Sequence, residues 1–266
     1  MANLGFIGAG NMGYAMLKGA ANVFPKEDLT YTDVNKTRLE EIKKETGISY
    51  VDGNISLVKS VKYIVLAIKP QFLDGVLDEI KSEITDHHVV ISIAPGVTID
   101  HYKEYFGKNT KIVRAMPNTP ALVNEGMSGI CFSKDAFSEE EKKMVYAFFD
   151  SFGKYEEVNE NLMNAVTCAS GSSPAYVYMF IEALADSAVK YGIPRDKAYA
   201  FAAQTVLGSA KMVLETKQHP GALKDMVCSP GGTTIAAVAA LEEYGFRNSI
   251  IKATDACYEK SAGFKK

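Results

Sequence analysis

Two kinds of hydrophobic pattern divide the chain near residue 160. In residues 1–160, short apolar runs alternate with amphipathic runs of helical spacing. The short runs predict strands at residues 4–8, 29–33, 63–68, 89–93, 111–115 and 128–132. Helices are predicted between them, for example at residues 36–46 and 71–80, and Ser138 with Glu141 has the spacing of a capping box. Alternation of this kind is typical of an α/β domain with a doubly wound parallel sheet covered by helices on both faces.

From residue 161 onward the strand pattern stops and Ala-rich helical runs follow one another. Pro174, directly after two serines, begins a helix that is predicted to end at Tyr191, because Gly192 follows. Further helices are predicted at residues 194–216 and 233–244, and a last one after Gly245. We therefore expect an α/β domain over residues 1–160 and an all-helical domain over residues 161–266.

The helix predicted over residues 194–216 is apolar on nearly every side between residues 200 and 210. A helix of that kind must be buried on every side. An all-helical segment of about one hundred residues has little core of its own. We therefore expect the helical domain to pack against a second copy of itself and to form a homodimer.

A glycine pattern follows the first predicted strand. Gly8, Gly10 and Gly13 lie in the spacing G-x-G-x-x-G between that strand and a helix, and Asp33 ends the second predicted strand. In this context the first glycine makes a tight turn, the second lets the backbone approach a pyrophosphate, and the third allows close packing of helix and strand. The pattern predicts a dinucleotide-binding domain.

A second glycine-rich segment, SPGGTT, covers residues 229–234. Gly231 and Gly232 interrupt the helical pattern, and Thr233 and Thr234 open the next helix. Free backbone N–H groups, a positive helix end and two hydroxyls would meet there, an arrangement that suits a small carboxylate. The alternative is a plain turn between two packed helices.

Charge and composition exclude several classes of protein. The net charge of −3 comes without a basic stripe, which argues against a nucleic-acid partner. No apolar run reaches the length of a membrane span, and the N-terminus has no charged-then-apolar signal. The 4 cysteines lack metal-site or disulfide spacing, so we expect reduced thiols in a cytoplasmic protein and no metal.

Five segments together resemble the pyrroline-5-carboxylate reductase family over essentially the whole chain. They are GFIGAGNM at residues 5–12, AIKP at 67–70, RAMPNTPA at 114–121, SGSSPAY at 170–176 and KDMVCSPGGTT at 224–234. The first is shared with many dehydrogenases, and the last three together are specific to the family. The resemblance implies a Rossmann-type domain followed by a dimerisation domain. It also implies reduction of 1-pyrroline-5-carboxylate to L-proline by hydride from NAD(P)H, the final step of L-proline biosynthesis.

The glycine pattern, with the acid spaced after it, and the resemblance together imply a set of cofactor-binding residues. They are Ile7, Gly8, Ala9, Gly10, Asn11, Met12, Asp33, Asn35, Asn54, Ala67, Ile68, Lys69 and Pro70. Asp33 would favour the ribose 2′-OH of NADH, whereas Asn35, Lys36 and Arg38 would hold the 2′-phosphate of NADPH. We expect NADPH as cofactor, with NADH as an alternative. Pro95 departs from the small residue usual in the family and removes one N–H donor.

The resemblance also places the substrate. Thr234 would hydrogen-bond or protonate the ring nitrogen, directly or through water; the alternative for Thr234 is a simple helix cap. The substrate carboxylate would be held by Ser229, Gly231, Gly232 and Thr233, while Asn118 lines the cleft. Arg114 is either a carboxylate clamp or a tie that holds the loop over residues 116–120. The histidines, at positions 87, 88, 101 and 219, are interpreted as surface or loop residues and supply no general acid.

Two rival functions fit part of the pattern. A 3-hydroxyacid dehydrogenase opens with a similar turn but carries a lysine followed four residues later by asparagine, and here Glu215 follows Lys211. A dinucleotide sensor without turnover would have no use for the carboxylate-binding segment. For the assembly, the family implies a homodimer through the C-terminal helices, with a larger ring as an alternative.

Overall fold

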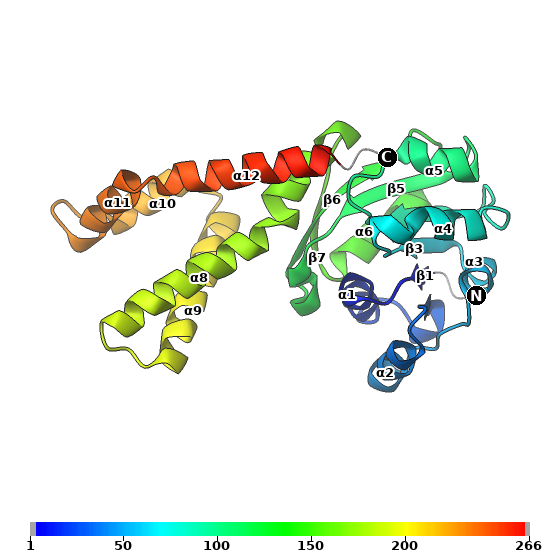
Figure 1. Ribbon diagram of the computed structural model, residues 1–266, viewed down its shortest axis with the longest axis horizontal. Helices are drawn as coiled ribbons and strands as arrows, with labels where there is room; N and C mark the ends of the chain where they lie inside the picture. Colours follow the sequence, from blue (N-terminus) through cyan, green and yellow to red (C-terminus); the bar gives the residue numbers. More distant parts are fainter. Residues whose placement is uncertain (1–3, 264–266) are drawn as a thin grey trace. The chain divides into compact units, whose positions relative to one another are not determined.

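The computed structural model describes residues 4–263, which form two compact units (Figure 1). The sheet unit holds residues 4–172 together with residues 257–263, and the helical unit holds Ser173–Ala256. The units divide after Ser172 because the turns that follow residue 160 pack on the sheet: Met163 is buried in its core, and Val166 lies against Gly129. The predicted division of function between residues 1–160 and 161–266 stays a prediction.

The sheet has seven strands in the order β2-β1-β3-β4-β5-β6-β7. Their bounds are β1 Leu4–Ile7, β2 Leu29–Thr32, β3 Tyr63–Leu66, β4 Val89–Ser92, β5 Lys111–Met116, β6 Gly126–Phe132 and β7 Gly153–Glu157. Strands β1 to β5 are parallel, as predicted. β6 instead runs antiparallel to β5, because residues 117–125 are too short for the crossover that a parallel neighbour requires.

Helices cover both faces of this sheet (Figure 1). They are α1 Asn11–Ala20, α2 Lys36–Thr46, α3 Asn54–Ser60, α4 Pro70–Ile80, α5 Ile99–Phe106, α6 Glu139–Asp150 and α7 Met163–Val166. Four single turns complete the unit: η1 Lys26–Asp28, η2 Thr119–Val123, η3 Glu160–Leu162 and the π-helical η4 Thr167–Gly171. Neighbouring strand residues face opposite cores: Phe6 packs with α1, α2 and α6, and Ile7 with α3, α4 and α5.

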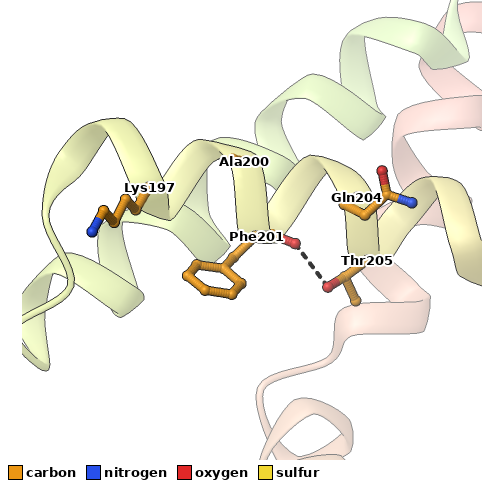
Figure 2. A pocket seen from close by; sticks show the side chains of 5 residues that line it. All are labelled: Lys197, Ala200, Phe201, Gln204 and Thr205. Carbon is orange, nitrogen blue, oxygen red and sulfur yellow. Dashed lines mark hydrogen bonds between the residues drawn. The ribbon is translucent and has the colours of Figure 1, made fainter.

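The helical unit contains α8 Ser173–Lys190, α9 Arg195–Thr216, α10 Pro220–Val227, α11 Thr233–Glu243 and most of α12, Phe246–Ala262. Its buried side chains are small: Ala185, Ala198 and Ala202. Phe201 and Leu214 on α9 are 62% and 77% exposed within one chain. Phe201 borders a hollow of about 410 Å³ on α9, and Figure 2 shows its ring projecting from that helix. The apolar surface of α9 therefore needs cover from outside the chain, which the sequence had predicted.

Candidate active site

In the turn after β1, two positions have no room for a side chain and must be glycine. Gly8 has a φ of +98°, and a Cβ there would lie 2.5 Å from the Ala67 carbonyl oxygen. A Cβ on Gly13 would lie 2.1 Å from the Gly8 carbonyl oxygen. Gly10, in contrast, faces open space, because a Cβ added there would meet nothing within 4 Å. The turn is therefore packed on its inner side and open at Gly10.

The open side of this turn fits a dinucleotide pyrophosphate. Gly10 is the N-cap of α1 and provides no side-chain oxygen to cap the helix. The first N–H groups of α1 therefore remain available to an anion, and the helix dipole favours negative charge there. The missing Cβ at Gly10 lets a phosphate approach the backbone closely. Cofactor binding at residues 7–12 is consistent with this geometry.

Asp33 braces the turn instead of leaving its carboxylate free. Its Oδ2 accepts a hydrogen bond from the Ala9 N–H at 2.7 Å, and its Oδ1 accepts from the Asn35 N–H at 2.9 Å. Asn35 in turn caps α2, because its Oδ1 accepts from the Arg38 N–H at 3.1 Å. The sequence had predicted that Asp33 binds a ribose hydroxyl. The position of Asp33 at the end of β2 did not indicate these two hydrogen bonds to the backbone.

Arg38 lies close to the same turn. Its guanidinium stacks 4.7 Å from the ring centre of Tyr14, and its Nε donates to the Ala9 carbonyl oxygen at 3.4 Å. Burial, aided by the neighbouring Glu45, raises the pKa of Tyr14 to about 12, so the ring stays neutral. Nothing in the sequence indicated that Tyr14 would stack against Arg38.

The turn after β3 lies beside the first turn. The Ala67 N–H donates to the Ile7 carbonyl oxygen at 2.9 Å, and Pro70 begins α4 with Lys69 as its N-cap. Lys69 is exposed. Asn54 begins α3 and donates from Nδ2 to Glu79 at 2.7 Å, so its amide is partly engaged. The predicted cofactor residues thus follow three adjacent parallel strands or begin α3, at the carboxyl edge of the sheet where such ligands bind.

Asn118 and Arg114 hold the chain around β5. The Asn118 Nδ2 donates to the Ser170 carbonyl oxygen at 3.0 Å, and its Oδ1 accepts from the Met127 N–H at 2.8 Å. Arg114, 6% exposed, donates from Nη1 to Glu160 at 3.1 Å. Arg114 is therefore tied to Glu160 and not to the loop over residues 116–120, and its role as a carboxylate clamp or as a tie for that loop stays a prediction.

The second glycine-rich segment lies in the helical unit and leaves the start of α11 without a side-chain cap. Gly232 is the N-cap of α11 without a side-chain cap, and the Gly232 N–H donates to the Ser229 carbonyl oxygen at 3.0 Å. Thr234 is therefore not the N-cap, and its hydroxyl forms no hydrogen bond within the described residues. Gly231, with a φ of +68°, turns the chain into the helix. The first turn of α11 presents N–H groups and a hydroxyl together.

Two histidines are more buried than a surface or loop position suggests. His101 lies on α5, partly buried, with its Nε2 2.9 Å from the Asp74 Oδ1, and His88 lies in the loop before β4. His88 is 7% exposed; its Nδ1 accepts from the Thr85 N–H at 3.0 Å, and its Nε2 is 3.3 Å from the Val58 carbonyl oxygen. Burial lowers its pKa below the usual value. Its partners are structural, so His88 supplies no acid to the glycine turns.

Residues 4–263 offer neither a metal site nor a membrane span. No group of three or more His, Cys, Asp and Glu side chains is placed to hold a metal ion in that part of the chain. Nor does any helix there have the length and apolar character needed to cross a bilayer. The four cysteines are free thiols, of which Cys131 and Cys168 are buried.

Comparison with known proteins supports both parts of the chain. A family model described as NADP oxidoreductase, coenzyme F420-dependent, matches residues 3–96, and one described as pyrroline-5-carboxylate reductase dimerisation matches residues 160–264. The pyrroline-5-carboxylate reductase of Escherichia coli (strain K12) is 47% identical over 266 residues, which cover 99% of this chain and 98% of that protein. The chain belongs to the pyrroline-5-carboxylate reductase family. Membership makes it an NAD(P)H-dependent oxidoreductase, so neither rival function applies.

Solved structures agree with this reductase over its whole length. The pyrroline-5-carboxylate reductase of Coxiella burnetii has a TM-score of 0.92 and 33% identity, covering 100% of this chain and 99% of that one. The pyrroline carboxylate reductase of Plasmodium falciparum, with NADP bound, has a TM-score of 0.89 and 37% identity, covering 100% and 98%. The predicted fold class, a Rossmann-type sheet domain followed by an all-helical domain, is confirmed. The dimerisation match identifies the helical part as the part that forms the homodimer.

Proposed function

We propose that this reductase converts 1-pyrroline-5-carboxylate to L-proline, the final step of L-proline biosynthesis. Family membership supports the activity, and the free first turn of α11 beside Thr234 is the observation that carries the substrate assignment. When bound, NAD(P)H supplies the hydride that reduces the carbon of the imine. The residues of the chain have to hold two ligands and provide one proton to the ring nitrogen, which is work of orientation and electrostatics.

The cofactor is held by the residues at the carboxyl ends of β1, β2 and β3. N–H groups of α1 and the open face of Gly10 bind the pyrophosphate. Arg38, fixed by the Tyr14 ring, binds a 2′-phosphate, since the Asp33 carboxylate already accepts two backbone N–H groups. This arrangement supports NADPH as the preferred cofactor, with NADH as the alternative. Lys69 and Asn54 complete the site from the neighbouring turns.

The substrate is held by the segment over residues 229–234. The N–H groups of Thr233 and Thr234 lie at the positive end of α11 and bind the carboxylate, with Gly231, Gly232 and Ser229 shaping the turn beside them. The Thr234 hydroxyl donates a hydrogen bond to the ring nitrogen or passes it a proton through water. The Asn118 amide is engaged with two backbone groups, so we propose that it positions the turns around β5, while its contact with the substrate stays a prediction.

The test of this function is oxidation of NADPH and NADH with 1-pyrroline-5-carboxylate, beside a 3-hydroxyacid with NAD⁺. Turnover with the imine alone is expected. Thr234→Ala is expected to lower kcat/KM by about ten- to a thousand-fold, the range for one lost polar contact at the reacting centre. The matched control is Thr254→Ala on α12, whose hydroxyl bonds only to carbonyls of its own helix. Equal rates for the two variants would remove Thr234 from the mechanism.

We further propose that the dimers assemble into a larger ring and that the protein is cytoplasmic. The ring is supported by the wide apolar surface of the helical unit, which includes Tyr244 at 85% exposure and Tyr191 at 79%. Free thiols support a reducing compartment. Analytical ultracentrifugation at micromolar concentration distinguishes a dimer from a ring of dimers.

A further inference from the structure

The turn between β4 and α5, residues 93–98, is held to its own neighbours at both ends. Before the turn, the Ser92 hydroxyl accepts from the Ala94 N–H at 3.3 Å and lies 2.5 Å from the hydroxyl of the buried Tyr102. After it, Thr98 caps α5 by accepting from the His101 N–H at 3.2 Å. Between these anchors lie Pro95 and Gly96, which has a φ of +76°.

One side chain reaches this turn from a distant part of the chain. The Glu160 Oε1 accepts the Ile99 N–H at 2.7 Å, across 61 positions of sequence. The same oxygen accepts from the Arg114 Nη1 at 3.1 Å. Because Arg114 is 6% exposed and lies in the middle of β5, its guanidinium fixes the carboxylate against the sheet. Glu160 therefore joins the start of α5 to β5.

The turn that Glu160 holds lies beside the cofactor residues. β3 and β4 are parallel neighbours with Leu66 opposite Ser92, and the Ile93 N–H donates to the Leu66 carbonyl oxygen at 3.3 Å. Residues 93–98 thus follow β4 at the same edge of the sheet as Ala67. Pro95 has no N–H to offer a ligand. The contribution of this turn to cofactor binding therefore depends on its shape and position.

The turn is packed on one side and open on the other. Ala94 and Val97 are 2% and 1% exposed and belong to the core beneath the sheet. On the open side lies a surface pocket of about 410 Å³, bordered by Gly96, Thr98, Arg114 and Glu160. On that side the hydrogen bond from Ile99 to Glu160 holds the end of the turn.

We propose that Glu160 is a positioning residue for the reduction: it fixes the turn over residues 93–98 against the bound dinucleotide without touching either ligand. This inference rests on the proposed function, because it assumes that the dinucleotide lies at this edge of the sheet. It adds a residue outside every motif that the sequence identified.

The test compares Glu160→Ala with Glu160→Gln, and with Glu156→Ala as the control. Glu156 is an exposed carboxylate on β7 that forms no hydrogen bond within the described residues. In the free enzyme, Glu160→Ala is expected to speed amide hydrogen exchange at Ile99 about ten-fold or more, because that N–H loses its acceptor. The Kd and KM for NADPH are expected to rise about ten-fold, the size of one lost charge-assisted hydrogen bond, while kcat changes less.

Glu160→Gln separates positioning from folding. Its amide oxygen still accepts the Ile99 N–H, so exchange at Ile99 and the KM for NADPH are expected to return most of the way to the wild-type values. A Glu160→Ala variant with a lower thermal midpoint but unchanged exchange and KM would overturn the proposal. If Glu160→Ala does not fold, Glu160→Asp, one methylene shorter, takes its place in the same comparison. Failure of the proposed function is recognised separately, as a wild-type enzyme that does not turn over the imine.

Discussion

The carboxylate of Glu141 is predicted to stabilise the sheet unit by several kcal/mol. Glu141 is 3% exposed and lies in the first turn of α6. Its oxygens accept from Lys111 Nζ at 2.8 and 2.9 Å and from Lys62 Nζ at 2.9 Å, and its Oε2 accepts from the Ser138 N–H at 2.9 Å. Burial alone would raise the pKa of this carboxyl, but the bonds from Lys111 and Lys62 outweigh it and lower the pKa from 4.5 to about 2.

The size of the effect follows from that shift. A fall from 4.5 to about 2 corresponds to about 3 kcal/mol of stability at neutral pH. Glu141→Gln removes the charge while its amide oxygen can still accept from the Ser138 N–H, so the capping box is largely kept. It leaves Lys62 and Lys111 without their carboxylate. We therefore expect the variant to lose about 3 kcal/mol, within the usual range for breaking a buried ion pair.

Urea unfolding followed by circular dichroism measures this loss as a function of pH. Because the folded pKa is lowered, the contribution is complete above the unfolded pKa and disappears as the pH falls toward the folded one. The difference between wild type and Glu141→Gln is expected to shrink to about half near pH 3. Glu139→Gln is the control: its side chain is 93% exposed on the same helix turn, and a surface pair contributes about 0–1 kcal/mol. Equal losses in both variants, or a difference independent of pH, would refute the reasoning.

Three further predictions concern single positions. Gly13→Ala is expected to lower the thermal midpoint, because its Cβ would lie 2.1 Å from a carbonyl oxygen. Gly10→Ala is expected to keep the thermal midpoint and to raise the Kd for NADPH, measured by calorimetry. Unchanged NADPH binding in Gly10→Ala would contradict a pyrophosphate at that face. Ser128→Ala is expected to leave stability in urea unchanged or raise it by about 1 kcal/mol, because the buried hydroxyl has no partner within the described residues. His88 has a lowered pKa, so wild-type stability is expected to fall as the pH drops below 6.5, and His88→Gln should reduce that slope; identical slopes would count against it.

Much of the sheet unit could be predicted from the sequence, because its inner strands are short apolar runs. Strand β1 was expected at residues 4–8 and spans Leu4–Ile7, and α2 was expected and found at residues 36–46. β7 was missed because its sequence, Gly-Lys-Tyr-Glu-Glu, is polar, as edge strands often are to prevent pairing with other chains. The antiparallel direction of β6 was missed because it depends on loop length and not on any pattern within the strand.

The site could be predicted at positions where the backbone conformation or close packing allows only glycine. Gly8 and Gly13 are needed by the chain itself and therefore form a motif. Asp33 was found by its spacing, but the groups it bonds to depend on the three-dimensional path of the turn. Glu160 carries no motif at all, because its partners are 61 and 46 positions away. Long-range side-chain contacts of this kind have no local signal.

The small core of the helical unit has a consequence for the enzyme in dilute solution. Only three of its described residues, Ala185, Ala198 and Ala202, are buried within one chain. The stability of the folded unit therefore depends on binding a second copy, and so on the protein concentration. Each ten-fold dilution then removes about 1.4 kcal/mol from the dimer. Because residues 229–234 belong to this unit, the segment proposed to hold the substrate is expected to lose its structure when the dimer dissociates. The specific activity of this reductase therefore depends on its own concentration.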